Sequence, residues 1–211
     1  MRFIVFIQKV RYFLIFKMMK KILVIQGGGR PKGNTSQLIA SFVKGTQEAG
    51  HQTEVINLIK NEVKPCLGCF TCQTGKPCVI NDSFSKIVPK LKEADCLVLA
   101  SPMYYYTFSS RIKSFVERMF SLMPDKYPKD FYTKEYKPPT KDIALMVTAA
   151  DGEFWAFEQL VSYYRFNMVD FMGFRDKGMV LAGGCIEDEQ HKGVASTRFL
   201  EEAYQFGKKI Y

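Results

Sequence analysis

Residues 21–36 read KILVIQGGGRPKGNTS, and this stretch decides the fold. Its first six residues form a near-continuous aliphatic run, which predicts a β-strand buried on both faces. The glycines that follow predict a tight turn. Apolar residues then recur at helical spacing from Leu38 to Val43, and Gly50 marks the end of the predicted helix. A strand, a glycine-rich turn and a helix in this order are typical of the first unit of a parallel α/β sheet.

The rest of the chain repeats this alternation. Apolar runs predict four more strands, at 53–58, 96–100, 143–148 and 178–182, and Ser101-Pro102 ends the one at 96–100. Apolar stripes predict helices at 112–120, around 154–168 and at 199–206. Five strands alternating with helices predict one doubly wound parallel sheet with helices on both faces. Such sheets bind ligands beyond the carboxyl ends of their strands, so we expect the site in the loops after the first, third and fourth strands.

The 211 residues are expected to form one domain, spanning 19–211. Residues 1–18 are aromatic and basic, and Lys9, Arg11 and Lys17 interrupt their apolar runs, so we expect an extension outside the core and no membrane span. The segment 124–141 is rich in Pro, Lys and Tyr without periodicity. A functional lid or interface arm and a plain surface insertion are both consistent with it.

Charge and cysteine usage narrow the functional classes. The formal net charge is +9, but the lysines are interspersed with acidic residues, which favours a solvated surface over a nucleic-acid-binding face. Four of the six cysteines are crowded between residues 66 and 78, an arrangement unlike a secreted disulfide scaffold. We therefore expect a reducing, cytoplasmic location.

The glycine-rich turn has the chemistry of a phosphate site. Glycines allow backbone amides to approach an anion closely, the helix N-terminus adds free N–H groups and a positive dipole end, and Arg30 adds a charged fork. The turn has neither a Walker motif nor a dinucleotide fingerprint. The residues expected to bind the phosphate are Gly28, Gly29, Arg30, Gly33, Asn34, Thr35 and Ser36.

The same turn carries a specific family resemblance. GGGRPKGNTS resembles the G-S-P-R-x-x-G-N-T-S loop of the NADPH-dependent FMN reductase and iron–sulfur flavoprotein family, in which this loop binds the FMN phosphate. Gly28 and Gly29 replace that family's Ser and Pro, which removes one hydroxyl contact. The resemblance extends over roughly residues 20–211. It implies a flavodoxin-like fold with strand order 2-1-3-4-5, bound FMN, NAD(P)H as cosubstrate, and a homo-dimer or homo-tetramer.

Two further loops are expected to hold the flavin ring. SPMYYY at 101–106 is similar to the family's S-P-V-Y-W and supplies apolar and aromatic walls. The turn after the fourth strand replaces a more glycine-rich turn of the family. The residues expected at the ring are Pro102, Met103, Tyr104, Tyr105 and Tyr106 from the first loop, and Thr148, Ala149, Ala150 and Asp151 from the second. Lys113 and Arg118 also match the family, and we expect structural or interface roles for them rather than chemical ones.

The remaining motif is the cysteine cluster Cys66-x2-Cys69-x2-Cys72-x5-Cys78. Thiolates at this spacing are able to wrap an iron–sulfur cluster, and the motif resembles that of iron–sulfur flavoproteins. A 4Fe–4S cluster and free thiols that pack the loop both remain open, and zinc is a weaker alternative. Cys96 and Cys185 are expected in the core.

The sequence thus predicts an FMN-dependent NAD(P)H oxidoreductase of the flavin or quinone reductase type, which passes electrons to a small-molecule acceptor. The alternative is an iron–sulfur flavoprotein that exchanges electrons with a ferredoxin-like partner. We name no catalytic acid or base, because the cofactor carries the chemistry in this class.

Overall fold

The computed structural model describes residues 19–123, 141–187 and 192–211. The predicted extension 1–18 and the segment 124–140 lie outside these residues. Within the described ranges no helix has both the length and the apolar character that a membrane crossing needs.

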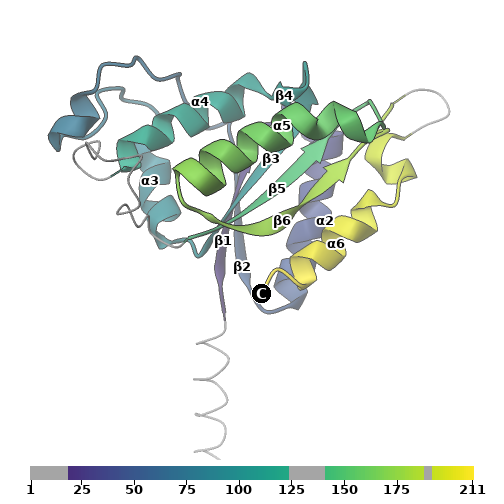
Figure 1. Ribbon diagram of the computed structural model, residues 1–211. Coiled ribbons are helices and arrows are strands. Elements are labelled where there is room, and N and C mark those ends of the chain that lie inside the picture. The colour runs from purple at the N-terminus through teal and green to yellow at the C-terminus, as the bar shows by residue number, and fades with distance from the viewer. Residues whose placement is uncertain (1–18, 124–140, 188–191) are drawn as a thin grey trace, which may run out of the picture.

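A parallel sheet forms the centre of the fold (Figure 1). Its strands are β1 (Lys21–Gln26), β2 (Gln52–Asn57), β3 (Cys96–Tyr104), β5 (Asp142–Thr148) and β6 (Arg175–Ala182). Their spatial order is β2-β1-β3-β5-β6, and all four neighbouring pairs run parallel. This order confirms the predicted flavodoxin-like topology. The short strand β4 (Thr107–Phe108) pairs antiparallel with the end of β3 and shifts the strand numbering by one.

Two helical layers cover the two faces of this sheet (Figure 1). The helices are α2 (Asn34–Glu48), α3 (Phe84–Glu93), α4 (Ser110–Arg118), α5 (Glu158–Tyr164) and α6 (Phe199–Lys208). Short 3-10 segments are η1 (Thr71–Thr74), η2 (Met119–Leu122), η3 (Phe154–Phe157) and η5 (Gly193–Ser196), and η4 (Arg165–Phe171) is π-helical. Side chains of α3, α4 and α5 form one buried core, and those of α2 and α6 form the other.

The strand β3 is longer than the sequence predicts. We expected Ser101-Pro102 to end it, but the strand continues to Tyr104, with Pro102 opposite Thr148. Ala100 accepts a hydrogen bond from the Gly27 amide on the β1 side, so Pro102, two residues on, faces the same side. The strand β1 has already ended there, and the missing proline N–H leaves no partner unsatisfied. The longer strand places Tyr104, and the turn that follows it, beyond the carboxyl end of β1.

A buried ion pair fastens the loop that carries Cys66 to Cys78, here called the cysteine loop, to the end of α4. The Arg118 guanidinium donates to both carboxylate oxygens of Asp82, at 2.7 and 3.2 Å, and to the carbonyls of Lys64 and Ile80. The two side chains are only 1% and 6% exposed. Burial by itself raises the pKa of Asp82, but the hydrogen bonds from Arg118 and from two backbone amides outweigh it and lower the pKa. The structural role expected for Arg118 is therefore visible in the fold.

We expect the substitution Arg118→Met to lower the free energy of unfolding by about 3 kcal/mol or more, because it leaves a buried carboxylate without its partner. Urea denaturation followed by circular dichroism measures this change.

Arg111→Met is the matched control, since Arg111 is exposed on the same helix. This substitution should lower the free energy of unfolding by less than about 0.5 kcal/mol. A lowered Asp82 pKa means that the pair contributes fully above the ordinary carboxyl pKa and is lost as Asp82 protonates. The difference between wild type and Arg118→Met should therefore shrink as the pH falls below about 4. Equal losses in both variants, or a difference independent of pH, would contradict this assignment.

Candidate functional site

A cavity of about 250 Å3 opens at the carboxyl ends of the parallel strands. It lies beyond the neighbouring strands β1 and β3, between which the strand order reverses direction, the usual ligand position of an open α/β sheet. Its walls come from the three loops that the sequence analysis selects. The lining residues are Gly28, Gly29, Arg30, Gly33, Asn34, Thr35, Ser36, Pro102, Met103, Tyr104, Thr148, Ala149 and Ala150. Tyr105, Tyr106 and Asp151 do not line it.

The backbone of the first loop leaves little room for side chains. A Cβ on Gly28 would lie 3.1 Å from the Cβ of Thr35, and one on Gly29 would lie 3.0 Å from Cδ1 of Ile59. The helix α2 begins directly after Gly33, and no side chain caps its N-terminus. Free amides and the positive end of the helix dipole therefore face the cavity, as an anion site requires.

The side chain of Asn34 is already engaged within the protein. Its amide nitrogen donates to the Cys185 carbonyl at 2.9 Å, and its oxygen accepts from the Val194 amide at 2.8 Å. Both partners lie in the segment between β6 and α6. Asn34 therefore holds that segment against the first loop, and only its backbone N–H is left for an anion. The sequence offers no local signal for this arrangement, because the partners are 151 and 160 residues away.

The other polar side chains of the loop also tie it in place. The hydroxyls of Thr35 and Thr148 lie 2.7 Å apart and join the loops that follow β1 and β5. Ser36 donates to the Arg30 carbonyl at 2.8 Å and accepts from Gln26. The Arg30 guanidinium forms an ion pair with Glu187, a residue that the sequence analysis does not select. Arg30 is still 67% exposed, so its charge remains accessible from solution.

The loops after β3 and β5, which are expected to hold the flavin ring, differ in which side chains they turn toward the cavity. Met103 and Pro102 are half-buried in the cavity wall, whereas Tyr104 is 56% exposed at its edge. Asp151 shapes its own turn: its carboxylate accepts from the Glu153 amide at 2.9 Å, and its carbonyl accepts from the Gly184 amide. The expected ring contact of Asp151 thus has no support from the cavity lining.

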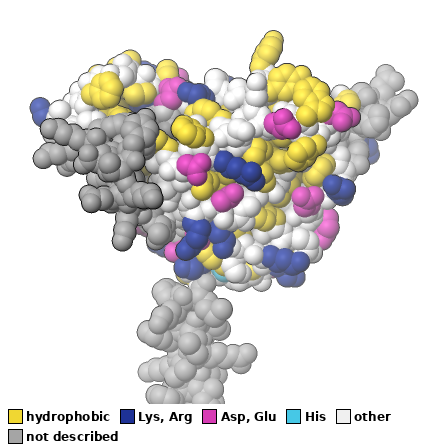
Figure 2. Space-filling view, viewed as in Figure 1, with side chains coloured by type: hydrophobic (Ala, Val, Ile, Leu, Met, Phe, Trp, Pro, Cys, Tyr) yellow, Lys and Arg dark blue, Asp and Glu magenta, His cyan; other side chains and the backbone are white. Residues whose placement is uncertain are grey.

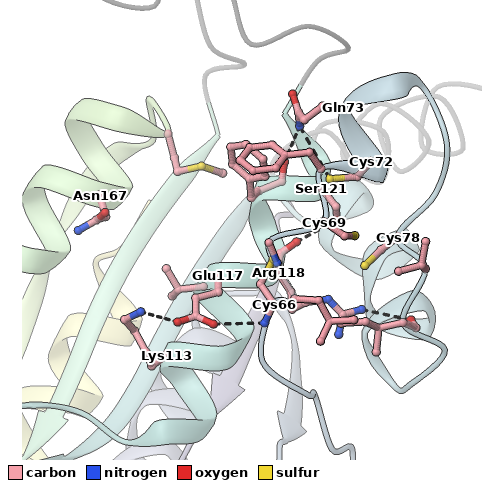
Figure 3. Close-up of a pocket in the computed structure, with 18 of the residues that line it drawn as sticks. Cys66, Cys69, Cys72, Gln73, Cys78, Lys113, Glu117, Arg118, Ser121 and Asn167 are labelled. Atoms are coloured by element: carbon pink, nitrogen blue, oxygen red, sulfur yellow. Dashed lines mark hydrogen bonds and ion pairs between the residues drawn. The ribbon is translucent and has the colours of Figure 1, made fainter.

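The cysteine loop borders a second, larger cavity of about 710 Å3 (Figure 3). Cys66, Cys69, Cys72 and Cys78 all line it, together with one face of α4 and residues of α5 and η4. All four are free thiols, and hydrogen bonds with Thr71 lower the pKa of Cys69. Across the described ranges no three Cys, His, Asp or Glu side chains lie close enough to hold a metal ion. The four thiols thus surround one cavity without converging on a point that a single metal ion could occupy.

Charged residues of α4 support this second cavity (Figure 3). Lys113 and Glu117 form an ion pair at 2.6 Å, and Glu117 also accepts from the Cys66 amide at 3.2 Å. The hydrogen bond with Glu117 raises the pKa of Lys113. For Glu117, burial is outweighed by the hydrogen bonds from Lys113 and Cys66, so its pKa is lowered. Lys113 thus takes part, through Glu117, in the contacts that hold the cysteine loop. The two cavities share no lining residue.

The two remaining cysteines are buried, as expected. Cys96 lies at the start of β3, and burial raises its pKa to about 12. Burial likewise raises the pKa of Cys185 to about 11. Both thiols are therefore buried and protonated at neutral pH, which disfavours reaction as a thiolate.

Solved structures with this fold are numerous. An NAD(P)H:quinone oxidoreductase from Methanothermobacter marburgensis superposes with a TM-score of 0.73 and 15% identity, over 91% of this chain and 96% of its own. An azoreductase from Bacillus anthracis superposes with a TM-score of 0.67 and 20% identity, over 90% of this chain and 100% of its own. At these identities the likeness establishes the fold alone.

Proteins related to this chain in sequence indicate the family to which it belongs. An iron–sulfur flavoprotein of Methanocaldococcus jannaschii is 38% identical over 98 residues, which cover 46% of this chain and 51% of the relative. Matches to three other iron–sulfur flavoproteins likewise span about half of each relative's length. A Bacillus subtilis protein named as an NAD(P)H-dependent FMN-containing oxidoreductase is 27% identical, over 83% of this chain and 94% of its own.

The family model described as NADPH-dependent FMN reductase matches residues 20–174, which contain the loops after β1, β3 and β5 and the whole cysteine loop. This chain belongs to the NADPH-dependent FMN reductase family.

Proposed function

We propose that this chain is an FMN-dependent oxidoreductase that accepts a hydride from NAD(P)H and passes electrons to a small-molecule acceptor. One observation carries the proposal: the uncapped N-terminus of α2 faces a cavity whose other walls are the apolar ends of β3 and β5. Family membership and the names of the relatives agree with it.

The residues present fit FMN. The amides at Gly28–Gly29 and at the start of α2, together with Arg30, would hold the phosphate, in a cradle that a Cβ on Gly28 would narrow. Pro102, Met103 and Tyr104 on one side and Ala149 and Ala150 on the other would enclose the ring. Bound FMN supplies the ability to take up a hydride and release electrons. The described lining contains no Asp, Glu, His or Lys, so the protein's part is to bind and orient.

A second candidate function is electron transfer with a ferredoxin-like partner through an additional 4Fe–4S cluster. It is favoured by the four cysteines around one cavity and by the names of the iron–sulfur relatives. The described thiols form no metal-binding group, so we assign no step to such a cluster. A homo-oligomer and a cytoplasmic location remain predictions.

We expect Arg30→Ala to raise the dissociation constant for FMN about tenfold, the effect of losing one charge-assisted hydrogen bond to the phosphate. Riboflavin lacks the phosphate, so its affinity should not change. Quenching of flavin fluorescence during titration of the apoprotein measures both constants.

Lys32→Ala is the control, because Lys32 is exposed in the same loop but does not line the cavity. Its effect on FMN affinity should be smaller than about threefold, as for an exposed charge. Equal affinity of the wild type for FMN and riboflavin would refute phosphate binding by this loop.

We expect NADPH or NADH to reduce the flavin of the FMN-loaded protein under anaerobic conditions, so that its visible absorption is lost. The absorption should return when a quinone is added. Stopped-flow spectrophotometry measures both steps. A stable FMN complex that neither nicotinamide bleaches would exclude nicotinamide turnover and leave the electron-transfer function.

We expect the double variant Cys66→Ser/Cys69→Ser to bind FMN within about twofold of the wild type, since the two cavities have separate linings. Iron and sulfide analysis of anaerobically purified protein tests the second candidate function. Stoichiometric iron in the wild type that the variant loses would support the cluster, and iron-free wild type would exclude it.

A further inference from the structure

The segment between β6 and α6 carries an acidic side chain up to the candidate phosphate site. Cys185 and Val194, near the two ends of this segment, both hydrogen-bond to the Asn34 side chain at the start of α2. Between them, Glu187 and Lys192 form an isolated antiparallel bridge. Figure 1 shows this segment and the start of α2 at the same end of the molecule, and η5 contacts α2. The segment is therefore fixed against the first loop.

A glycine at position 193 makes this close approach possible. Gly193 has a φ angle of 61°, in the left-handed region, and donates to the Ile186 carbonyl at 2.8 Å. A Cβ there would lie 2.1 Å from Oδ1 of Asn34 and 3.0 Å from Cγ of Glu187, so only glycine fits. The base of the Glu187 side chain is therefore held next to the first loop by backbone packing.

Arg30 meets the Glu187 carboxylate from the first loop. A Cβ on Gly33 would lie 3.3 Å from Nε of Arg30, so the Arg30 side chain folds back across the residue that precedes α2. From there its guanidinium donates to Glu187. The two side chains are 67% and 38% exposed, so burial does not lock them together. An exposed ion pair is weak, and another anion is able to take over its cation.

This ion pair changes the charge of the cavity of about 250 Å3. Arg30 is the only charged residue of the described cavity lining, and Glu187 is not part of that lining. A phosphomonoester carries a charge of about −1.5 to −2 at neutral pH, whereas the N-terminus of α2 offers only a partial positive charge. On the face shown in Figure 2, acidic and basic side chains are interspersed, so this face adds no broad positive field. The full positive charge of the site is thus already paired.

We propose that Glu187 competes with the FMN phosphate for Arg30 and so sets how tightly the flavin is held. This inference rests on the function proposed above and names a residue that regulates the same site. Glu187 acts through Arg30 and does not touch the flavin. In the free protein it holds the guanidinium, and FMN has to break this pair to gain the guanidinium for its phosphate. Riboflavin lacks the phosphate and leaves the pair intact.

The test titrates the flavin-free full chain with FMN and with riboflavin, and follows the quenching of flavin fluorescence. For Glu187→Gln we expect the dissociation constant for FMN to fall about twofold to fivefold, the range for the release of one exposed ion pair. The dissociation constant for riboflavin should not change. An unchanged or weaker affinity for FMN, or an equal gain for both flavins, would overturn the proposal.

The double variant shows whether Glu187 acts through Arg30. In the Arg30→Ala background Glu187 has no guanidinium to hold, so Glu187→Gln should no longer tighten the binding of FMN. A gain of the same size in that background would reveal plain repulsion between Glu187 and the phosphate, and would overturn the competition.

Glu153→Gln is the matched control, because Glu153 is exposed on the loop after β5 and the substitution removes the same charge, whereas the partner of Arg30 is Glu187. Its dissociation constant for FMN should equal that of the wild type, since solvent and salt screen an exposed charge at a distance. If Glu153→Gln tightened FMN binding as much as Glu187→Gln, net charge would explain both results and the proposal would fail.

Inorganic phosphate separates this inference from the proposed function, because it needs the anion site but no site for a flavin ring. We expect phosphate to raise the unfolding temperature of Glu187→Gln more than that of the wild type, relative to sodium chloride at equal ionic strength. Equal shifts in the two proteins would overturn the competition. A wild type that binds neither flavin, together with the larger phosphate shift in the variant, would refute the proposed function while the competition stands.

Discussion

The close approach of Gly27 to the start of α4 is the constraint on which the site depends. A Cβ at this position would lie 2.4 Å from Cγ1 of Ile112 and 2.5 Å from Oγ of Ser109, so only glycine fits. Gly27 donates to the Ala100 carbonyl and accepts from the Ser109 hydroxyl. The chain therefore leaves β1 pressed against α4 and β3. This exit path sets where the following turn lies and where α2 begins.

From that point the loops hold one another in place. The Thr35–Thr148 hydrogen bond joins the first loop to the end of β5, and the amide of Asn34 joins it to the segment after β6. Each bond is buried, so its partners have no water to compete for them. A site whose loops are already ordered loses less conformational entropy when a ligand binds. Polar residues that the sequence marks as phosphate ligands thus serve largely to preorganise the backbone that faces the cavity.

Sequence reasoning succeeds here where the signal is local. The strand at 21–26 has the predicted bounds, because an uninterrupted aliphatic run is typical of a strand buried on both faces. It fails where distant parts of the chain meet. The engagement of Asn34 and the Tyr106–Trp155 stack both depend on loops that only the folded sheet brings together. The extension of β3 past Pro102 likewise depends on where a different strand ends.

Helix α4 contacts the chain just before the first loop at one end and lines the cavity of the cysteine loop along the rest of its length. Ile112 and the preceding Ser109 support the exit of the first loop, whereas Lys113, Glu117 and Arg118 hold the cysteine loop. Ile112 and Phe115 are fully buried, so the middle of the helix is fixed against the sheet. A close-packed helix transmits displacement only as a body. A displacement of the cysteine loop would act on the first loop through α4, and the buried Arg118–Asp82 pair resists such a displacement.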